Sequence, residues 1–250
     1  MAVLVCPCVA SAQAKPAPSA SASPLPPPRP AELLPRAPVE RNVVKPPQPA
    51  PAEPTPSSAS TCLSRLAAIP GNRIEPAVSE LAQADAACRV EEPVRLHALA
   101  LRGSKAALTV TFDPAPLVSC AMASAVADWL DTSVQPLAQG HFAMGLTGLR
   151  VGGGQECRRR NRASAGPISE HATGQALDIF AFKLAEGGKS EVISVEKPSG
   201  LAQNRFLDGV RQSACGAFMT ALGPGSDAAH ANHLHVDIQA RRSRASRFCQ

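Results

Sequence analysis

Aromatic residues are almost absent from this sequence of 250 residues, which contains no tyrosine, one tryptophan and seven phenylalanines. Proteins that bind single-stranded nucleic acids stack bases on aromatic side chains, and the basic residues here are scattered along the chain. Nucleic-acid binding is therefore disfavoured. The net charge of +5 is mild and is compatible with a protein that works near anionic polymers.

Two further absences narrow the class of protein. No segment approaches the roughly 20 consecutive apolar residues that a transmembrane helix requires, so no transmembrane helix is predicted. No two cysteines have the spacing C-x-x-C, which disfavours both a zinc ribbon and a dithiol redox motif.

The first residues have the character of an export signal. The segment MAVLVCPCVASAQA (1–14) is apolar, contains Cys6 and Cys8, and ends in an A-x-A motif. It is interpreted as a secretory signal peptide, although the usual basic start is missing and a chance apolar terminus is the alternative.

Six cysteines remain, and none is close to another in the sequence. An even number of widely spaced cysteines in an exported chain predicts disulfides, with buried free thiols as the alternative. Proximity along the chain suggests the pairs Cys62–Cys88, Cys120–Cys157 and Cys215–Cys249, but other pairings remain open.

Residues 15–60 differ in composition from the rest of the chain. They consist mainly of Pro, Ala and Ser, and most of the 25 prolines lie before residue 60. Such a segment cannot bury enough apolar surface to offset its conformational entropy, so we expect a disordered linker that is partly polyproline II. Residues 61–250 are long enough to form one substantial core.

The periodicity of apolar residues in this second part predicts a mixed fold. Helical stripes occur in residues 61–69, 120–135 and 206–222, and the second is expected to end before Pro136. Extended patterns occur in residues 107–112, 148–154, 175–182 and 232–238. Residues 75–88 fit a helix or a loop, and residues 94–101 fit a buried strand or a helix. We predict an α+β fold with helices packed on a small antiparallel sheet.

Histidine and aspartate are concentrated in two short segments. SEHATGQALD (169–178) contains His171 and Asp178, and Gly174 between them permits a tight turn. HANHLHVD (230–237) contains three of the six histidines, and a strand here would place His233 and His235 on one face. Two imidazoles, one carboxylate and a water form an open tetrahedral zinc site of the catalytic kind.

These motifs resemble those of known zinc peptidases. SEHATGQALD is similar to the S-x-H-x-x-G-x-A-x-D signature shared by lysostaphin, the D-Ala-D-Ala metallopeptidases and the hedgehog signalling domain. H-x-x-H-x-H is similar to the second motif of the murein endopeptidases. Residues 61–250 as a whole resemble the bacterial extensin-like C-terminal domain family, through CLSRL, CAMASAVADWL, CRRRN, SEHATGQALDIFAF, ACGAF and LGPGSDAAHANHLHVDI.

The resemblance implies that one zinc ion is bound by His171, Asp178 and His235. A second register also fits the spacing, with His233 as the last ligand and His230 three residues before it.

The resemblance also assigns catalytic roles, to His233 as the general base and to His230 as a residue that stabilises the transition state. Many relatives have an acidic residue three positions before the last ligand, where this chain has Asn232. An amide cannot take a proton, so the work of the base falls to His233.

Two other residues are candidates for contact with the substrate. Arg158 in CRRRN, and less directly Arg160, can hold a carboxylate through bidentate hydrogen bonds, although an exposed basic loop is the alternative. The hydroxyl of Ser169 can orient a ligand or the substrate, or simply start a turn.

Taken together, the sequence favours an exported zinc-dependent hydrolase, periplasmic or extracellular, that cleaves amide bonds in peptidoglycan peptides. The alternative is a zinc-bearing but non-catalytic domain that binds the cell wall or a partner. A structural glycoprotein of the extensin type is disfavoured, because extensins cross-link through tyrosine and this chain has none.

Overall fold

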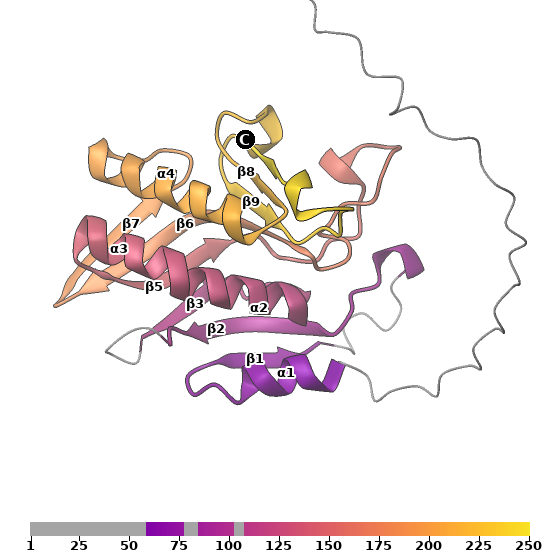
Figure 1. Ribbon diagram of the computed structural model, residues 1–250, viewed down its shortest axis with the longest axis horizontal. Helices are drawn as coiled ribbons and strands as arrows, with labels where there is room; N and C mark the ends of the chain where they lie inside the picture. The colour runs from indigo at the N-terminus through magenta and orange to yellow at the C-terminus, as the bar shows by residue number, and fades with distance from the viewer. Residues whose placement is uncertain (1–58, 78–84, 103–107) are drawn as a thin grey trace, which may run out of the picture. The chain divides into compact units, whose positions relative to one another are not determined.

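A ten-stranded sheet forms the centre of the folded part of the chain (Figure 1). The computed structural model describes residues 59–77, 85–102 and 108–250. The predicted signal peptide (1–14) and all but the last two residues of the predicted linker (15–60) lie outside the described residues. The mixed α+β class is confirmed, but the sheet is much larger than the small sheet that the sequence predicted.

The strand order along the sheet is β1-β2-β3-β5-β6-β9-β8-β10, with β4 also paired to β2 and β7 to β6. Eight of the ten strands precede β9: β1 (Arg73–Pro76), β2 (Pro93–Ala100), β3 (Thr109–Asp113), β4 (Leu117–Ser119), β5 (Gly145–Val151), β6 (Ala176–Glu186), β7 (Lys189–Ser194) and β8 (Thr220–Leu222). The last two are β9 (Leu234–Asp237) and β10 (Phe248–Cys249). The pairs β3–β5 and β8–β10 are parallel, so the sheet is mixed rather than purely antiparallel.

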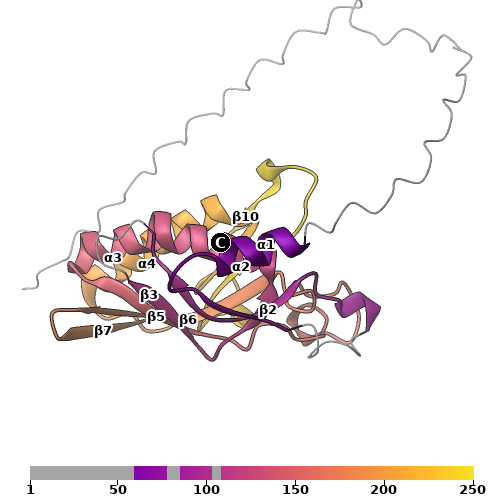
Figure 2. The same cartoon turned by 90° about the horizontal axis from the view of Figure 1, so that it is seen from below.

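The long helices lie on one face of this sheet, as the two views show (Figures 1 and 2). The four α-helices of the described residues are α1 (Ala59–Ala67), α2 (Cys120–Trp129), α3 (Gln135–Phe142) and α4 (Gly200–Ala217). None of the helices described is both long enough and apolar enough to cross a bilayer. The arrangement is a helical layer on a sheet, which leaves the other sheet face for polar side chains.

The core lies between the helical layer and the sheet. Trp129 at the end of α2 is almost fully buried, and its ring meets the edge of Phe218 with centroids 5.3 Å apart. Its indole N–H donates a hydrogen bond to Oγ of Ser213 on α4, at 2.9 Å. From the sheet, Leu177 and Ile179 of β6 point into the same core. Burial of such aromatic and aliphatic side chains is the main source of stability for the domain.

Several helices and strands begin or end at residues other than those predicted from the sequence. The helical path does not stop before Pro136: a π turn (Leu130–Val134) follows α2, and Pro136 lies in the first turn of α3. The π turn interrupts the regular α-helical ladder directly before Pro136, so the N–H that proline lacks is lost at an already irregular point. Thr220–Leu222 is a strand rather than the end of a helix. Residues 94–101 fall mostly in β2, and 75–88 are not one helix in their described portions.

The described residues contain three disulfides, and two of the suggested pairings are wrong. The bonds are Cys62–Cys120, Cys88–Cys157 and Cys215–Cys249. Only the last matches the pairing by proximity, because the first two join residues that the tertiary fold brings together across 58 and 69 positions. Disulfides of this number are a hint of a secreted protein.

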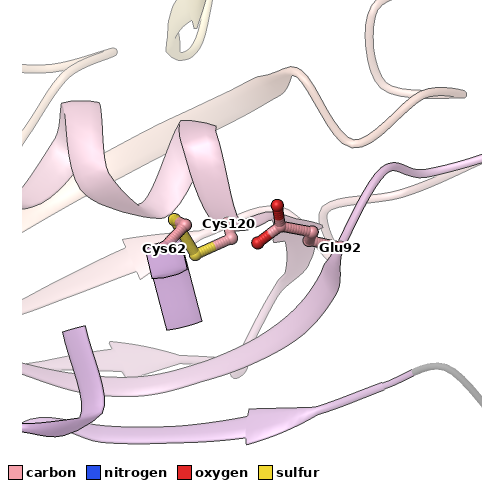
Figure 3. Close-up of side chains that lie close together, drawn as sticks. All are labelled: Cys62, Glu92 and Cys120. Atoms are coloured by element: carbon pink, nitrogen blue, oxygen red, sulfur yellow. A yellow bond between two sulfur atoms is a disulfide. The ribbon is translucent and has the colours of Figure 1, made fainter. Parts of the chain in front are cut away.

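One of these disulfides has a partly buried carboxyl group beside it (Figure 3). Glu92 lies close to Cys62 and Cys120, with potential ligand atoms of the three residues within 4.8 Å of one another. Both sulfur atoms are bonded to each other, so neither can bind a metal as a thiolate. Burial raises the pKa of Glu92, which favours the neutral carboxyl form.

Candidate metal centre

The register of two strands brings the first two candidate ligands together. Asp178 on β6 and His235 on β9 are direct cross-strand partners, and both point to the face opposite the core residues Leu177 and Val236. Side chains opposite one another in an antiparallel pair lie within contact distance. Nδ1 of His235 is accordingly 2.8 Å from Oδ1 of Asp178.

A turn before β6 brings in the third candidate ligand. The N–H of Gly174 donates to the carbonyl of His171, and Gly174 has a φ of +67°. A side chain at Gly174 would meet the backbone of Ser119 at 2.8 Å, so the turn requires glycine. Oγ of Ser169 accepts the backbone N–H of His171 at 3.3 Å, so Ser169 orients a candidate ligand through the turn.

The three donor groups converge on one point. Nε2 of His171 lies 3.1 Å from Oδ1 of Asp178, and the ligand atoms of His171, Asp178 and His235 all lie within 4.8 Å of one another. Zinc–ligand bonds of roughly 2.0–2.2 Å in a tetrahedron place ligand atoms about 3.3 Å apart. The two separations from Oδ1 of Asp178, 3.1 Å to His171 and 2.8 Å to His235, are close to that value, so these pairs are compatible with a shared zinc ion after small adjustments.

Each histidine of this set has a hydrogen-bond acceptor on its other ring nitrogen. Nδ1 of His171 donates to the carbonyl of Gly154 at 3.1 Å, and Nε2 of His235 lies 3.4 Å from Oδ2 of Asp237. A carbonyl or carboxylate at that position fixes the tautomer of a metal-ligating histidine. The remaining nitrogens, Nε2 of His171 and Nδ1 of His235, are the ones that face Asp178.

The close contacts within this cluster shift the pKa values of Asp178 and His235. Burial alone would raise the pKa of Asp178, but hydrogen bonds from His171 and His235 hold it well below its ordinary value. Burial alone would lower the pKa of His235, but hydrogen bonds to Asp178 and Asp237 outweigh it and raise that pKa to about 9. Without metal, the centre is therefore a buried ion pair.

Two more histidines complete the cluster without joining the set of converging ligand atoms. Nε2 of His233 lies 3.4 Å from Oδ1 of Asp178, and its pKa is lowered, mainly by burial. Nδ1 of His230 donates to Oδ1 of Asp227 at 2.7 Å. The rings of His230 and His235 have centroids 5.5 Å apart. This geometry favours the register in which His235, rather than His233, is the last ligand.

The cluster forms the floor of a pocket of about 430 Å³. One wall is the segment after Cys157, with Arg158, Arg160 and Arg162, and the other includes Arg241 and the exposed ring of Phe248. Four arginines and three carboxylates, those of Glu170, Asp178 and Asp227, line it, so these groups sum to one positive charge before the histidines are counted. The pocket therefore suits an anionic ligand.

Arg158 lines this pocket but is already paired. Its Nε donates to Oε2 of Glu156 at 2.9 Å, and Arg162 donates to the same carboxylate. Arg160 is paired with Glu170. One carboxylate between two guanidinium groups leaves positive charge in excess, so a substrate carboxylate can still be attracted to this wall.

Comparison with known protein families identifies the family of this chain. Residues 60–250 match the family described as extensin-like protein C-terminus. The chain belongs to this family. No curated protein and no solved structure matches the chain. The matched residues of the extensin-like domain include all of the cluster described above.

Sequence reasoning gave no role to three groups that complete the site of this extensin-like domain, which are the carbonyl of Gly154 and the carboxylates of Asp227 and Asp237. It noted Asn232 only as a missing acid and did not foresee its contact with His233. Asp237 stands two residues after His235, on the same face of the strand, which is a signal that period-2 alternation offers. The contact with Gly154 depends on a loop from β5 and has no local signal.

Proposed function

We propose that this extensin-like domain is an exported zinc-dependent hydrolase of amide bonds, with peptidoglycan peptides as substrates. One observation carries the proposal: three donor groups within 4.8 Å of one another lie on the floor of an open pocket, and a further imidazole faces them. An open ligand position beside a free base is the arrangement of catalytic rather than structural zinc.

The residues that would hold zinc are His171, Asp178 and His235. Two imidazoles and a carboxylate are the donors that catalytic zinc uses, and the acceptors on Nδ1 of His171 and Nε2 of His235 orient both rings. When bound, zinc supplies Lewis acidity, which polarises a carbonyl group and makes water more acidic.

The proton transfers of the proposed hydrolysis are carried out by side chains of the protein itself. Nε2 of His233 takes a proton from the attacking water, since Nδ1 of that ring is engaged by Asn232. His230 donates its Nδ1 hydrogen to Oδ1 of Asp227, which holds the imidazole ring in place. A charged His230 can stabilise the developing oxyanion or give a proton to the leaving amine.

The nature of the substrate is inferred from charge and from resemblance. The arginines of the pocket walls favour a peptide with free carboxylates, which peptidoglycan stem peptides carry. The motifs around His171 and His235 resemble those of lysostaphin, the D-Ala-D-Ala metallopeptidases and the murein endopeptidases, which act on such peptides. The three disulfides support a periplasmic or extracellular location.

The test has two steps. Elemental mass spectrometry of the purified chain should find about one zinc per molecule, and His235→Ala should lose it. Zinc-loaded protein should then release new amino groups from peptidoglycan fragments, and His233→Ala should keep zinc but lose hydrolysis. No zinc after zinc is offered, or full activity in His233→Ala, contradicts the proposal.

A non-catalytic binding role is the second candidate, and the amide at Asn232 is the observation that favours it. In that case zinc is bound, no fragment is cleaved, and the His233→Ala variant sediments with cell-wall polymer as well as the unmodified chain. Activity gained in Asn232→Asp, starting from an inactive chain, would identify a silenced relative of the peptidases.

A further inference from the structure

His233 has a defined tautomer because of its neighbour Asn232. Nδ1 of His233 lies 2.8 Å from Oδ1 of Asn232, and an amide oxygen can only accept a hydrogen bond. The ring hydrogen is therefore on Nδ1, and Nε2 has the free lone pair. Nε2 lies 3.4 Å from Oδ1 of Asp178 in a charge contact that is not a hydrogen bond, so the hydrogen bond to Asn232 sets the tautomer.

The plane of the same ring is fixed by an aromatic neighbour. The rings of His233 and Phe180 have centroids 5.2 Å apart at 39°, within the range of favourable aromatic pairs. The guanidinium carbon of Arg150 lies 5.2 Å from the Phe180 centroid, close enough for a cation–π contact. Arg150, Phe180 and His233 thus form one stack that ends at the metal centre.

Strand register places Phe180 in this stack. Phe180 lies two residues after Asp178 on β6 and so shares its face, and Ile179 between them pairs with Leu234, the residue after His233. The pairing of β5 with β6 shifts register beside Phe180, between Arg150 and Val151, whose partners are Ala181 and Ile179.

We propose that Asn232 and Phe180 are positioning residues that hold His233 with Nε2 facing the three candidate ligands. The catalytic consequence rests on the proposed function, while the orientation itself does not. Asn232 stands where related peptidases have an acid, and here the amide serves by orienting the neighbouring imidazole. Those peptidases use an acidic residue at this position as the general base. In this chain His233 would be the base, and Asn232 would orient it.

Nuclear magnetic resonance of the full chain tests the orientation directly. Long-range proton–nitrogen spectra of labelled protein, without zinc and with zinc, at mildly alkaline pH, report which ring nitrogen of each histidine carries hydrogen. His233 should be the Nδ1–H tautomer in the unmodified chain. Asn232→Leu removes the acceptor at an exposed position and should convert it to Nε2–H, whereas Asn232→Asp should preserve Nδ1–H. An Nε2–H ring in the unmodified chain, or no change in Asn232→Leu, overturns the proposal.

Phe180 is tested by the same spectra and a matched control. Phe180→Leu keeps an apolar side chain but removes the stack, so the His233 ring signals should broaden or divide. Phe248→Leu alters a phenylalanine that lines the pocket and for which no ring contact with His233 is found among the described residues. It should leave those signals unchanged. Equal effects of both variants, or none of Phe180→Leu, remove Phe180 from the proposal.

Kinetics then separate positioning from the proposed function. Asn232→Leu should retain one zinc per chain and a similar KM, with kcat lower by about 100-fold, the scale of a displaced general base. Asn232→Asp should restore most of kcat. If the unmodified chain cleaves nothing, the proposed hydrolase fails while the tautomer result still decides the positioning. If kcat is unchanged in Asn232→Leu, the positioning role fails while the hydrolase stands.

Discussion

Oδ1 of Asp178 lies 2.8 Å from Nδ1 of His235, and these two residues are direct partners on adjacent strands. The same oxygen is 3.1 Å from Nε2 of His171. Protons on the imidazoles therefore neutralise the carboxylate at the point where the proposed zinc ion would sit. If zinc binds as proposed, it competes with these protons for one site, and several properties of the domain should depend on which of them is bound.

The stability of zinc-free protein should fall as the pH rises. The pKa of His235 is raised to about 9 in the folded state, against about 6.5 in an unfolded chain. Its stabilising contribution is complete below pH 6.5 and disappears as the pH passes through 9, a loss of about 3 kcal/mol. Guanidinium unfolding between these pH values measures it. His235→Asn should show a flat profile over this range, and a rise in stability with pH in the unmodified chain would contradict the ion pair.

Zinc affinity should change with pH in the opposite direction. Binding to Nδ1 of His235 releases one proton, so the apparent affinity should increase about tenfold for each pH unit up to about pH 9. Competition titrations with a chromogenic chelator at several pH values give this slope. An affinity that is independent of pH would show that His235 is not a ligand.

The carboxylate of Asp237 should strengthen metal binding without touching the metal. It accepts a hydrogen bond from Nε2 of His235 and is itself held by the backbone N–H of Gln239. Asp237→Asn should lower zinc affinity by about 10–100-fold, the range for loss of a carboxylate behind a ligating histidine. Asp227→Asn, which alters the partner of His230, is the matched control and should leave zinc affinity unchanged.

Glycine at position 154 is required by the approach of another strand. Its φ is +83°, and a Cβ atom there would lie 2.3 Å from the carbonyl oxygen of Leu117. Gly154→Ala should displace the carbonyl that orients His171, lower the free energy of unfolding by about 1–3 kcal/mol and weaken zinc binding. Gly153→Ala is the control, since no atom lies within 4 Å of the added carbon. Similar losses in both variants would point to the loop as a whole.

The features of this site that depend on neighbouring residues can be predicted from the sequence. The features that depend on contacts between distant segments cannot. Alternation along a strand predicts that His233 and His235 share a face, and the glycine after His171 predicts a turn. The true partner of Cys62 depends on the docking of α1 against α2, which no spacing reveals. β10 has two residues and no periodicity, so only its pairing with β8 identifies it. The function of Asn232 depends on a ring orientation, which sequence does not specify.

The bond Cys88–Cys157 should matter for the substrate more than for the metal. Cys157 begins the segment that carries the arginines of one pocket wall, and none of the three candidate zinc ligands lies in that segment before residue 170. Replacing both cysteines by alanine should lower the free energy of unfolding by about 2–4 kcal/mol, as expected for a disulfide that closes a long loop. Zinc content should remain near one per chain, whereas KM for an anionic peptide should rise because the arginine wall is no longer tethered. Chemical denaturation, metal analysis and kinetics on the one variant measure all three. Loss of zinc together with the bond would mean that the wall supports the metal centre itself.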